Sequence, residues 1–384
     1  MLVPAILAAL TAGAGLALAL AGRIEVARFR RNTAPPPASF PGISVLKPLY
    51  GDEPLLEAAL ASICAQDYPR FQVVFGVQDP NDPALAAVAR VRTRFPDRDI
   101  AVVIDDTADG ANRKVANLMN MLPHARHEVL VIADSDMHAA PDYLRQIAAT
   151  LAAPGVGLVT TLYTGLPAQR GVAAEMGATG ITHLFLPGAI IARRLGRQDC
   201  LGATMALRRQ TLEAVGGFPA LVNHLADDHV LGRLVLDSGL RVGLAATVPA
   251  TTVPEATLGA LFRHELRWGR TILALTPIPF ALSAIQYPLA WALLALLLSG
   301  GEEWALALVL ATWAARAILA RGIDSVLGLS AAPAPVWLLP LRDVISVGVL
   351  VASFAGRDVQ WRGRTMRAVD ARRAGYKLPS TSAT

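Results

Sequence analysis

The sequence has only two cysteines, Cys64 and Cys200, and each lies in a segment whose composition indicates burial. Two isolated thiols exclude a disulfide framework and indicate a reducing compartment. The sequence also contains no Gly-x-Gly-x-x-Gly loop and no Walker loop, which argues against dinucleotide or ATP binding. Its seven histidines show no HxxxH or HExxH spacing, so they indicate scattered surface or core residues and not a histidine metal site.

Charge is missing from long stretches at the two ends of the chain. Residues 2–22 include no charged side chain and are long enough to span the hydrocarbon core of a membrane. A secretory signal peptide would need a charged n-region and a clear cleavage site, which this segment lacks. The arginines that follow place this flank in the cytoplasm by the positive-inside rule: Arg23, Arg28, Arg30 and Arg31. We therefore expect a transmembrane helix over 1–22, followed by a stiff linker at 35–37 and a cytosolic domain.

The carboxyl-terminal region contains three more apolar blocks, at about 279–298, 304–320 and 336–354. The first two predict a membrane hairpin that turns at 300–303. The third contains Arg342 and Asp343 near its middle, and charges at that depth are costly unless they are paired. Two crossings return the chain to the cytosol, whereas three would place the basic tail over 356–384 outside. We therefore expect the third block to be re-entrant or interfacial.

The overall composition fits a membrane enzyme better than a soluble one. Hydrophobic residues make up 53% and the mean hydropathy is +0.43, which is too apolar for a soluble α/β enzyme. A net charge of +5 and a pI near 9.5 favour an anionic membrane surface or a phosphorylated substrate as the partner. Nucleic acid is not expected, because the basic residues are not interleaved with aromatic ones on one segment.

The pattern of apolar segments over residues 23–260 predicts one cytosolic α/β domain. Predicted strands at 42–48, 71–77, 100–104, 129–133, 156–163 and 200–207 alternate with predicted helices at 53–65, 83–95, 110–122 and 141–151. This alternation indicates βαβ units and a mostly parallel, right-handed wound sheet. The apolar segment 181–195 predicts either a helix along the bilayer surface or a buried core helix. A helix over 261–278 then leads into the membrane region over 279–355.

Acidic residues follow the predicted strands where ligands bind. The strand 129–133 ends on Asp134, Ser135 and Asp136, and open α/β sheets bind ligands beyond the carboxyl ends of their strands. Two carboxylates one residue apart can hold a divalent cation that also carries phosphate oxygens, although an isolated pair is more often a polar turn. Asp79 follows the strand 71–77 in the same way. Asp228 begins a helix together with Asp227, so a capping role is the alternative for either acid.

The sequence resembles the membrane-bound GT-A glycosyltransferases, whose motifs are D, DxD, D and (Q/R)xxRW. The resemblance rests on these acids, on Arg267 and Trp268, and on the segment 66–69. Five segments resemble glycosyltransferase family 21 in particular: 46–51, 77–80, 114–118, 134–136 and 226–229. That family includes the ceramide glucosyltransferases and the bacterial N-acetylglucosaminyltransferase of hopanoid biosynthesis. The resemblance covers about residues 40–270 and implies a Rossmann-like GT-A domain flanked by transmembrane helices.

The resemblance also implies a role for each matching residue. Asp79 would hold the uracil or ribose end of a UDP-sugar, and Asp134 would contact the nucleotide-sugar. Asp136 would bind Mg²⁺ or Mn²⁺ on the diphosphate, and Asp228 would take the proton from the acceptor hydroxyl. Arg267 and Trp268 would close the donor side, where the family's Gln or Arg is His264 in this chain. Lys114 is a candidate for the diphosphate, with a solvated helix lysine as the alternative.

The chemistry of such a reaction agrees with this set of residues. A hydroxyl needs a carboxylate within hydrogen-bond reach to accept its proton, and one base with one displacement predicts inversion at the anomeric carbon. We therefore expect transfer of a sugar from a UDP-sugar to a lipid hydroxyl at the inner membrane of a bacterium. GlcNAc is the sugar that we expect. High Ala, Arg and Pro content suggests a GC-rich bacterial genome and thus a hopanoid acceptor, with ceramide glucosylation as the alternative.

Two other functions remain as rivals. A transporter or membrane scaffold would need polar pathways within the membrane, and only Arg316 and the pair Arg342 and Asp343 lie deep enough. A processive polysaccharide synthase would need more membrane spans for its channel than the apolar blocks supply.

Overall fold

The structure is a computed structural model that describes residues 2–31, 39–108, 110–356, 358–361 and 364–367. The predicted linker at 35–37 and most of the predicted basic tail lie outside these residues. The described chain forms two compact units. The sheet unit comprises 39–168 and 196–254, and the helical unit comprises 2–31, 169–195 and 255–367 with the gaps given above.

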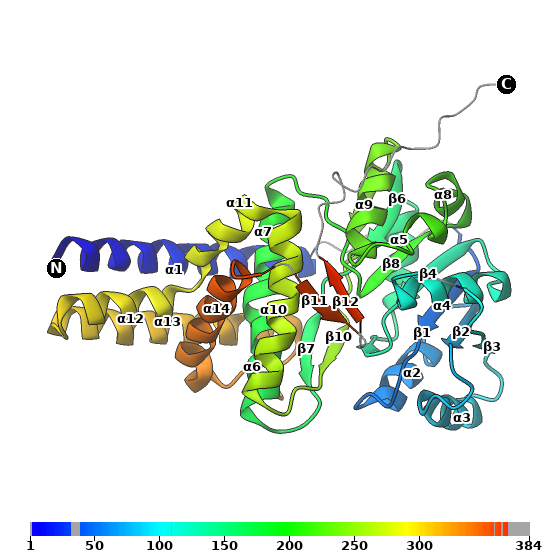
Figure 1. Ribbon diagram of the computed structural model, residues 1–384, viewed down its shortest axis with the longest axis horizontal. Helices are drawn as coiled ribbons and strands as arrows, with labels where there is room; N and C mark the ends of the chain where they lie inside the picture. Colours follow the sequence, from blue (N-terminus) through cyan, green and yellow to red (C-terminus); the bar gives the residue numbers. More distant parts are fainter. Residues whose placement is uncertain (1, 32–38, 109, 357, 362–363, 368–384) are drawn as a thin grey trace. The chain divides into compact units, whose positions relative to one another are not determined.

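The sheet unit is built on a seven-stranded sheet in the order β3-β2-β1-β4-β8-β6-β9 (Figure 1). All neighbouring strands are parallel except β8, which is antiparallel to both β4 and β6. The bounds of these strands are β1 Ile43–Pro48, β2 Phe71–Val77, β3 Ile100–Ile104, β4 Val129–Ala133, β6 Val156–Thr160, β8 Thr204–Arg208 and β9 Arg241–Leu244. The predicted alternation and the predominantly parallel sheet are confirmed, and β8 begins four residues later than the predicted 200–207 segment.

Helices cover both faces of this sheet because β4 and its neighbours are apolar on both sides. One face packs on α2, α3 and α5 in a core that includes Val45, Phe75 and Val131. On the other face α4 crosses Gly76, where a Cβ would collide with Met121 and Asn117. The helices of this unit are α2 Leu56–Cys64, α3 Ala84–Arg94, α4 Arg113–Met121, η1 Leu122–His124, α5 Tyr143–Leu151, α8 Arg209–Ala214, η3 Phe218–Ala220 and α9 Asp227–Asp237.

A small second sheet, in the order β5-β10-β7, lies beside the end of β4. It consists of β5 Met137–His138, β7 Thr164–Pro167 and β10 Ala250–Val253. Met137 of β5 pairs with Thr251 of β10. This pairing brings Thr251, which is more than a hundred positions away in the sequence, next to Asp136. The sequence did not predict β7, β9 or β10, because strands of four residues lack a hydrophobic period that distinguishes them from loops.

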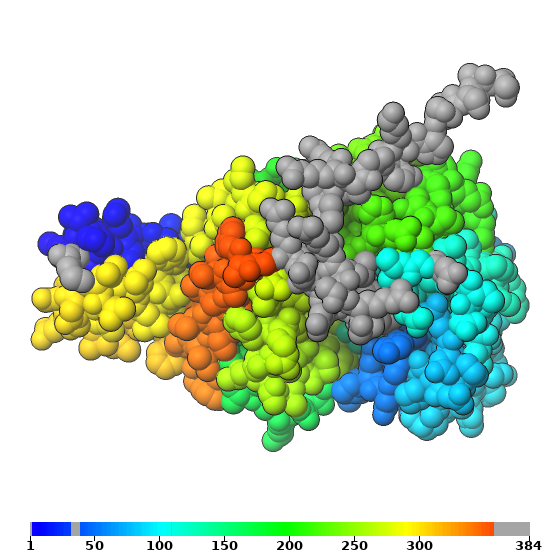
Figure 2. All heavy atoms as spheres, viewed as in Figure 1, coloured from blue at the N-terminus to red at the C-terminus, as the bar shows by residue number. Residues whose placement is uncertain are grey.

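The helical unit contains three helices that run side by side, α1 Leu2–Arg31, α12 Pro288–Ser299 and α13 Glu303–Leu327 (Figure 1). Figure 2 shows α1 in blue packed against α12 and α13 in yellow. Glycine permits part of this approach, since a Cβ at Gly15 would stand 3.1 Å from the Cβ of Pro288, the first residue of α12. The remaining elements are α6 Val172–Gly180, the π-helical η2 Ile181–Phe185, α7 Leu186–Arg194, α10 Leu258–Leu275, α11 Pro277–Leu282, η4 Ser283–Gln286, η5 Val336–Leu338, α14 Leu339–Ser353, β11 Asp358–Trp361 and β12 Arg364–Arg367.

Within the described residues, three helices are long and apolar enough to cross a membrane: α1, α13 and the segment Val336–Ser353 that ends with α14. A fourth candidate is broken, because Pro277–Gln286 and Pro288–Ser299 meet at a bend of 69°. The break thus lies in the first predicted block of the carboxyl-terminal region and not in the third. Figure 1 shows, however, that α14 and α10 run across the direction shared by α1, α12 and α13.

The segment 181–195 forms η2 and α7 and packs against α1. Ile181, Leu186 and Ile190 are buried, which fits the core-helix alternative. Arg194 pairs with Glu25 of α1 at 3.0 Å. A turn of π-helix places His183 in the interior, where its Nε2 lies 2.9 Å from Asp324 Oδ1 on α13.

Buried charge pairs connect the helices of this unit. Arg342 is 2% exposed and donates to both carboxylate oxygens of Glu265 on α10, at 2.7 and 2.6 Å. It also donates to Ser346 Oγ and to the carbonyl of Met176 on α6. Asp343 accepts from Arg316 of α13 at 3.3 Å and from the backbone of Leu289 at 3.0 Å. The charges that made the third apolar block unusual are therefore paired inside the protein.

Removal of one member of this network should destabilise the helical unit. Glu265→Gln keeps the shape of the side chain but leaves the Arg342 guanidinium without its counter-charge. Breaking a buried pair in this way costs about 3–5 kcal/mol, which lowers the melting temperature by roughly 10 °C in a chain of this size. Thermal melts in detergent measure the effect, with the exposed Glu213→Gln as the control. Equal melting temperatures for the two variants would show that the pair does not stabilise the fold.

Candidate active site

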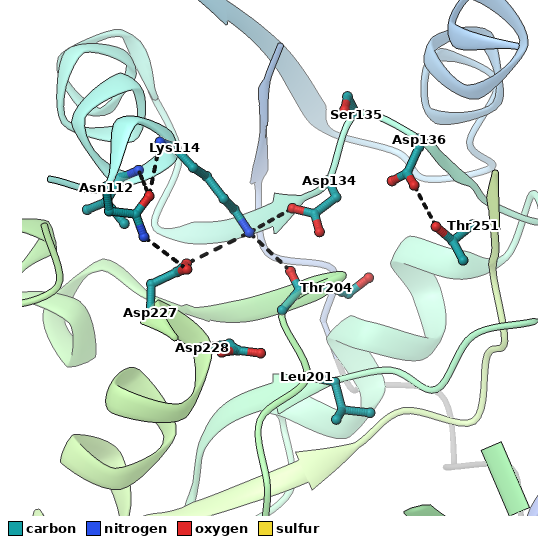
Figure 3. Close-up of polar contacts among 12 residues, drawn as sticks. Asn112, Lys114, Asp134, Ser135, Asp136, Leu201, Thr204, Asp227, Asp228 and Thr251 are labelled. Atoms are coloured by element: carbon teal, nitrogen blue, oxygen red, sulfur yellow. Dashed lines mark hydrogen bonds and ion pairs between the residues drawn. The ribbon is translucent and has the colours of Figure 1, made fainter. Parts of the chain in front are cut away.

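The carboxyl end of β4 carries three consecutive polar residues that project in different directions (Figure 3). The backbone N–H of Asp134 donates to Ala203 O, which ties the end of the strand to the chain before β8. Ser135 is buried and donates through Oγ to Glu53 Oε2. Asp136 accepts from Thr251 Oγ1 at 2.6 Å, so β10 fixes the orientation of this carboxylate. The turn is therefore held on three sides.

Asp136 lies in an environment that resists ionisation. Burial first, and then the neighbouring Asp134 carboxylate, raise the pKa of Asp136 to about 6. Lys47, from the end of β1, is fully buried next to these acids, and its ammonium lies 3.5 Å from Met137 O. Burial lowers the pKa of Lys47 to about 8, against the opposing effect of Asp136, Asp134 and Glu53. The neighbouring acids thus favour the charged form of Lys47, whereas the Asp134 carboxylate disfavours the charged form of Asp136.

Lys114 connects this turn to a second pair of acids. Its Nζ lies 2.7 Å from Asp134 Oδ1 and 3.8 Å from Asp227 Oδ2, and it donates to Gly202 O at 3.4 Å. Burial alone would lower the pKa of Lys114, but Asp134 and Asp227 outweigh it and raise that pKa above its ordinary value. This lysine is buried, not solvated, which contradicts the alternative considered from the sequence.

Asp227 and Asp228 are the first two residues of α9 and have different surroundings. Asp227 is buried and accepts from the side-chain amide of Asn112 at 3.3 Å. Asp228 accepts a hydrogen bond at the start of its own helix, from the backbone N–H of His229 at 2.7 Å. Burial, and then the charge of Asp227, raise the pKa of Asp228 to about 6. A carboxyl group whose pKa is raised in this way, as that of Asp228 is, is suited to accept a proton near neutral pH.

Of the other predicted site residues, one belongs to the sheet unit and three belong to the helical unit. Asp79 follows β2 in the sheet unit, is exposed, and accepts from the backbone N–H of Asn81. His264, Arg267 and Trp268 lie on α10 in the helical unit. There His264 Nδ1 pairs with the carboxylate of Glu255, and its ring lies edge-on to Trp268 with centroids 4.5 Å apart.

The acids at the end of β4 could supply only some of the ligands of a divalent cation. Carboxylate oxygens are the donors that Mg²⁺ and Mn²⁺ prefer. In the part of the chain that the structure describes, no three His, Cys, Asp or Glu side chains converge on one point. Asp134 is engaged by Lys114, which leaves Asp136 as the principal donor. The donor set therefore fits a cation that takes its remaining ligands from water and from phosphate oxygens.

Several residues of this site were not predicted from the sequence. Lys47 and Thr251 reach the acids through strand pairing, and Glu53 reaches them from the loop between β1 and α2, so no local pattern indicates these residues. Asn112 did have a signal, because Asn directly before a helix is a preferred N-cap. It caps α4 by accepting from the N–H groups of Lys114 and Val115.

Curated relatives of the chain are glycosyltransferases. "Ceramide glucosyltransferase 1" of Caenorhabditis elegans is 22% identical over 264 residues, which are 68% of this chain and 56% of the nematode protein. "N-acetylglucosaminyltransferase" of Rhizobium leguminosarum bv. viciae is 25% identical over 303 residues, 71% of this chain and 68% of the rhizobial protein. The chain spans only about half the length of the nematode ceramide glucosyltransferases that it matches.

A solved structure shows the same fold. The mannosyltransferase PcManGT from Pyrobaculum calidifontis, in complex with GDP-Man and Mn²⁺, superposes with a TM-score of 0.51 and 21% identity. The match covers 91% of this chain and 99% of that one. This similarity confirms the predicted fold class, an α/β domain of the GT-A type with helices apolar enough to span a membrane. The pattern of glycosyl transferase family 21 matches residues 6–374, so the chain belongs to that family, as the resemblance predicted.

Proposed function

We propose that this protein is an inverting glycosyltransferase that moves a sugar from a UDP-sugar to the hydroxyl group of a membrane lipid. The observation that carries this proposal is the link through Lys114 between the acids that end β4 and the acids that begin α9. The names of its relatives, a ceramide glucosyltransferase and an N-acetylglucosaminyltransferase, support a sugar donor. The GDP-Man and Mn²⁺ of the archaeal structure support a nucleotide-sugar and a divalent metal.

On the donor side, Asp136 is the metal ligand that we propose, with Asp134 and Lys114 beside it. A bound Mg²⁺ or Mn²⁺ would neutralise the charge that develops on the departing diphosphate. The Lys114 ammonium, now paired with two acids, can turn one of its N–H groups to a diphosphate oxygen. Asp79, exposed beyond β2, would contact the uridine end of the donor. Arg267, Trp268 and His264 complete the donor-binding set as proposed from the family pattern.

On the acceptor side, Asp228 is the proposed base. Its carboxylate accepts the proton of the lipid hydroxyl as the oxygen attacks the anomeric carbon, and the sugar–phosphate bond breaks on the opposite side. One displacement inverts the anomeric configuration. Gly202 lies next to this carboxylate, since a Cβ there would stand 3.0 Å from Asp228 Oδ2. The absence of a side chain at position 202 leaves that approach open.

For the acceptor we propose a hopanoid such as bacteriohopanetetrol and for the donor UDP-GlcNAc. The N-acetylglucosaminyltransferase relatives of rhizobia support this choice. The ceramide glucosyltransferase relatives support the second candidate, transfer of glucose from UDP-glucose to ceramide. A transporter or scaffold role has less support, because Arg316, Arg342 and Asp343 are engaged in pairs with other residues.

We further propose that α1, α12 and α13 cross the inner membrane of a bacterium, while α14 lies at its cytosolic face. The orientation of α14 across the other three helices supports this arrangement (Figure 1). With two crossings after the catalytic domain, the chain after α14 returns to the cytosolic side. The proposed domains are then a helix over 1–22, a catalytic domain over 23–260, an interfacial helix over 261–278, a membrane region over 279–355 and a cytosolic tail over 356–384.

The metal assignment predicts the behaviour of Asp136→Asn. This variant keeps the hydrogen bond from Thr251 but removes the negative charge that the cation needs. We expect the Mn²⁺-dependent part of UDP binding to fall at least tenfold, as measured by calorimetry with and without the metal. Asp142→Asn, an exposed acid of the same unit, serves as the control. Unchanged metal-dependent affinity in Asp136→Asn would refute the assignment.

The base assignment predicts a pH dependence. Asp228 acts only when it is deprotonated, so the rate should be lost as pH falls through about 6, the raised pKa of this carboxyl. Asp228→Asn should lower the transfer rate by about 10²–10⁴-fold, the usual contribution of a general base. Asp227→Asn should retain most of the rate and shift the acid limb to lower pH, because the charge that raises the pKa of Asp228 is gone.

Transfer of labelled sugar to extracted lipid between pH 4.5 and 8, beside a thermal melt of each variant, measures these effects. Near-normal turnover in a folded Asp228→Asn protein would exclude Asp228 as the base. An acid limb that does not move in Asp227→Asn would assign that limb to another group.

The proposed topology predicts opposite accessibility for the two ends of α13. A cysteine at Glu302, in the turn between α12 and α13, should react with an impermeant maleimide on intact cells. A cysteine at Ser330, after α13, should react only after the membrane is opened. The native thiols do not interfere, because Cys64 and Cys200 are buried. Labelling of the Ser330 position on intact cells would contradict the arrangement.

A further inference from the structure

Asn112 is a fully buried side chain that the proposed reaction does not use directly. Its Oδ1 accepts from the N–H groups of Lys114 and Val115, at 3.1 and 3.2 Å, and so caps α4. Its Nδ2 donates to His224 O at 2.8 Å and to Asp227 Oδ1 at 3.3 Å. One amide therefore contacts the start of α4 with its oxygen and the start of α9 with its nitrogen (Figure 3).

The backbone around Asn112 makes the same connection. The N–H of Asn112 donates to Val222 O at 2.8 Å, and the N–H of Ala111 donates to Asn223 Oδ1 at 3.3 Å. At Gly110 any side chain would collide with Val222. The segment before α4 is thus joined along three consecutive residues to the segment before α9.

This connection determines where Asp228 lies. Both oxygens of Asp227 face the start of α4, one toward Asn112 and the other toward Lys114. Successive residues of a helix are about 100° apart around its axis. When Asp227 is held toward α4, Asp228 is turned to the side of Gly202, where its Oδ2 would meet any added Cβ at 3.0 Å. The direction of the proposed base thus follows from the anchoring of its neighbour.

We propose that Asn112 is a positioning residue, which sets the helix of the proposed base, α9, against the helix that carries the donor-side Lys114, α4. The proposal rests on the proposed function, because it concerns the same reaction. Only a side chain with both an acceptor and a donor serves the two helices at once. Asp or Ser would cap α4 equally well, but Asp would place a second carboxylate against Asp227, and Ser is too short to reach it.

The two roles of Asn112 can be separated because these replacements keep the cap. In Asn112→Asp and Asn112→Ser the Lys114 end of the site stays in place, so UDP affinity with Mn²⁺ should change less than threefold. The turnover number should fall roughly 10- to 100-fold, the effect of a small displacement of a catalytic group. The double variant Asn112→Asp with Asp227→Asn exchanges amide and carboxylate, and it should recover at least fivefold over Asn112→Asp.

Asn120→Asp is the matched control. Asn120 lies on the same helix, is also buried, and donates to a backbone carbonyl, that of Asp105, away from the acids. It should lose stability in the melt but keep its turnover number. Turnover, UDP affinity by calorimetry and a thermal melt are measured for every variant.

The outcomes separate the proposals. A loss of turnover in both Asn112 variants with intact UDP binding, and recovery in the double variant, would support the positioning role. The positioning role would be overturned if turnover fell only in proportion to the unfolded fraction, if UDP affinity fell as much as turnover, or if the double variant did not recover. In each of these cases an active wild-type protein would leave the proposed function standing. A wild-type protein that binds no UDP and transfers no sugar would overturn both.

Discussion

The position of Lys114 between Asp134 and Asp227 is the interaction on which the site depends. Five carboxylates gather around it and Lys47, namely Glu53, Asp134, Asp136, Asp227 and Asp228. With all of them ionised, two ammonium groups would leave three negative charges in a buried place, and like charges there repel strongly. Burial first, and then this repulsion, raise the pKa values of Asp136 and Asp228 to about 6. A divalent cation, which we propose that Asp136 binds, would relieve the same repulsion.

Much of the sheet unit could be predicted because its strands are apolar and its acids stand at strand ends. The five apolar residues before Asp134 were sufficient to predict β4, and the acids that follow them are the basis of the ligand site that we propose. Lys47 could not be assigned in this way, since it enters the site only because β1 pairs with β4. Thr251 reaches Asp136 through a pairing between strands of two and four residues, which leaves no periodic pattern in the sequence. Local pattern thus reveals the acids, whereas tertiary structure supplies their counter-charges.

Hydropathy was less informative in the helical unit, because α14 turns its charges inward. Arg342 and Asp343 are buried against α10, α12 and α13, while Leu341, Val344 and Val351 are exposed. The apolar segment was visible in the sequence, and so was the need to pair its charges. Their partners were not, since Glu265 lies 77 residues away on another helix. Composition alone qualifies α14 as a span, and only its direction relative to α1, α12 and α13 argues for another placement.

His264 shows how the structure limits what one residue of a family pattern can do. The pattern has Gln or Arg at this position, and either side chain can direct more than one polar group at a ligand. Here Nδ1 is engaged by Glu255, so the imidazole has only Nε2 left for any other partner. That nitrogen is buried and has no hydrogen bond within the described residues. The ring also packs edge-on against Trp268, which follows one turn later. At this position the chain therefore has a residue that contacts Trp268 and can make at most one further polar contact.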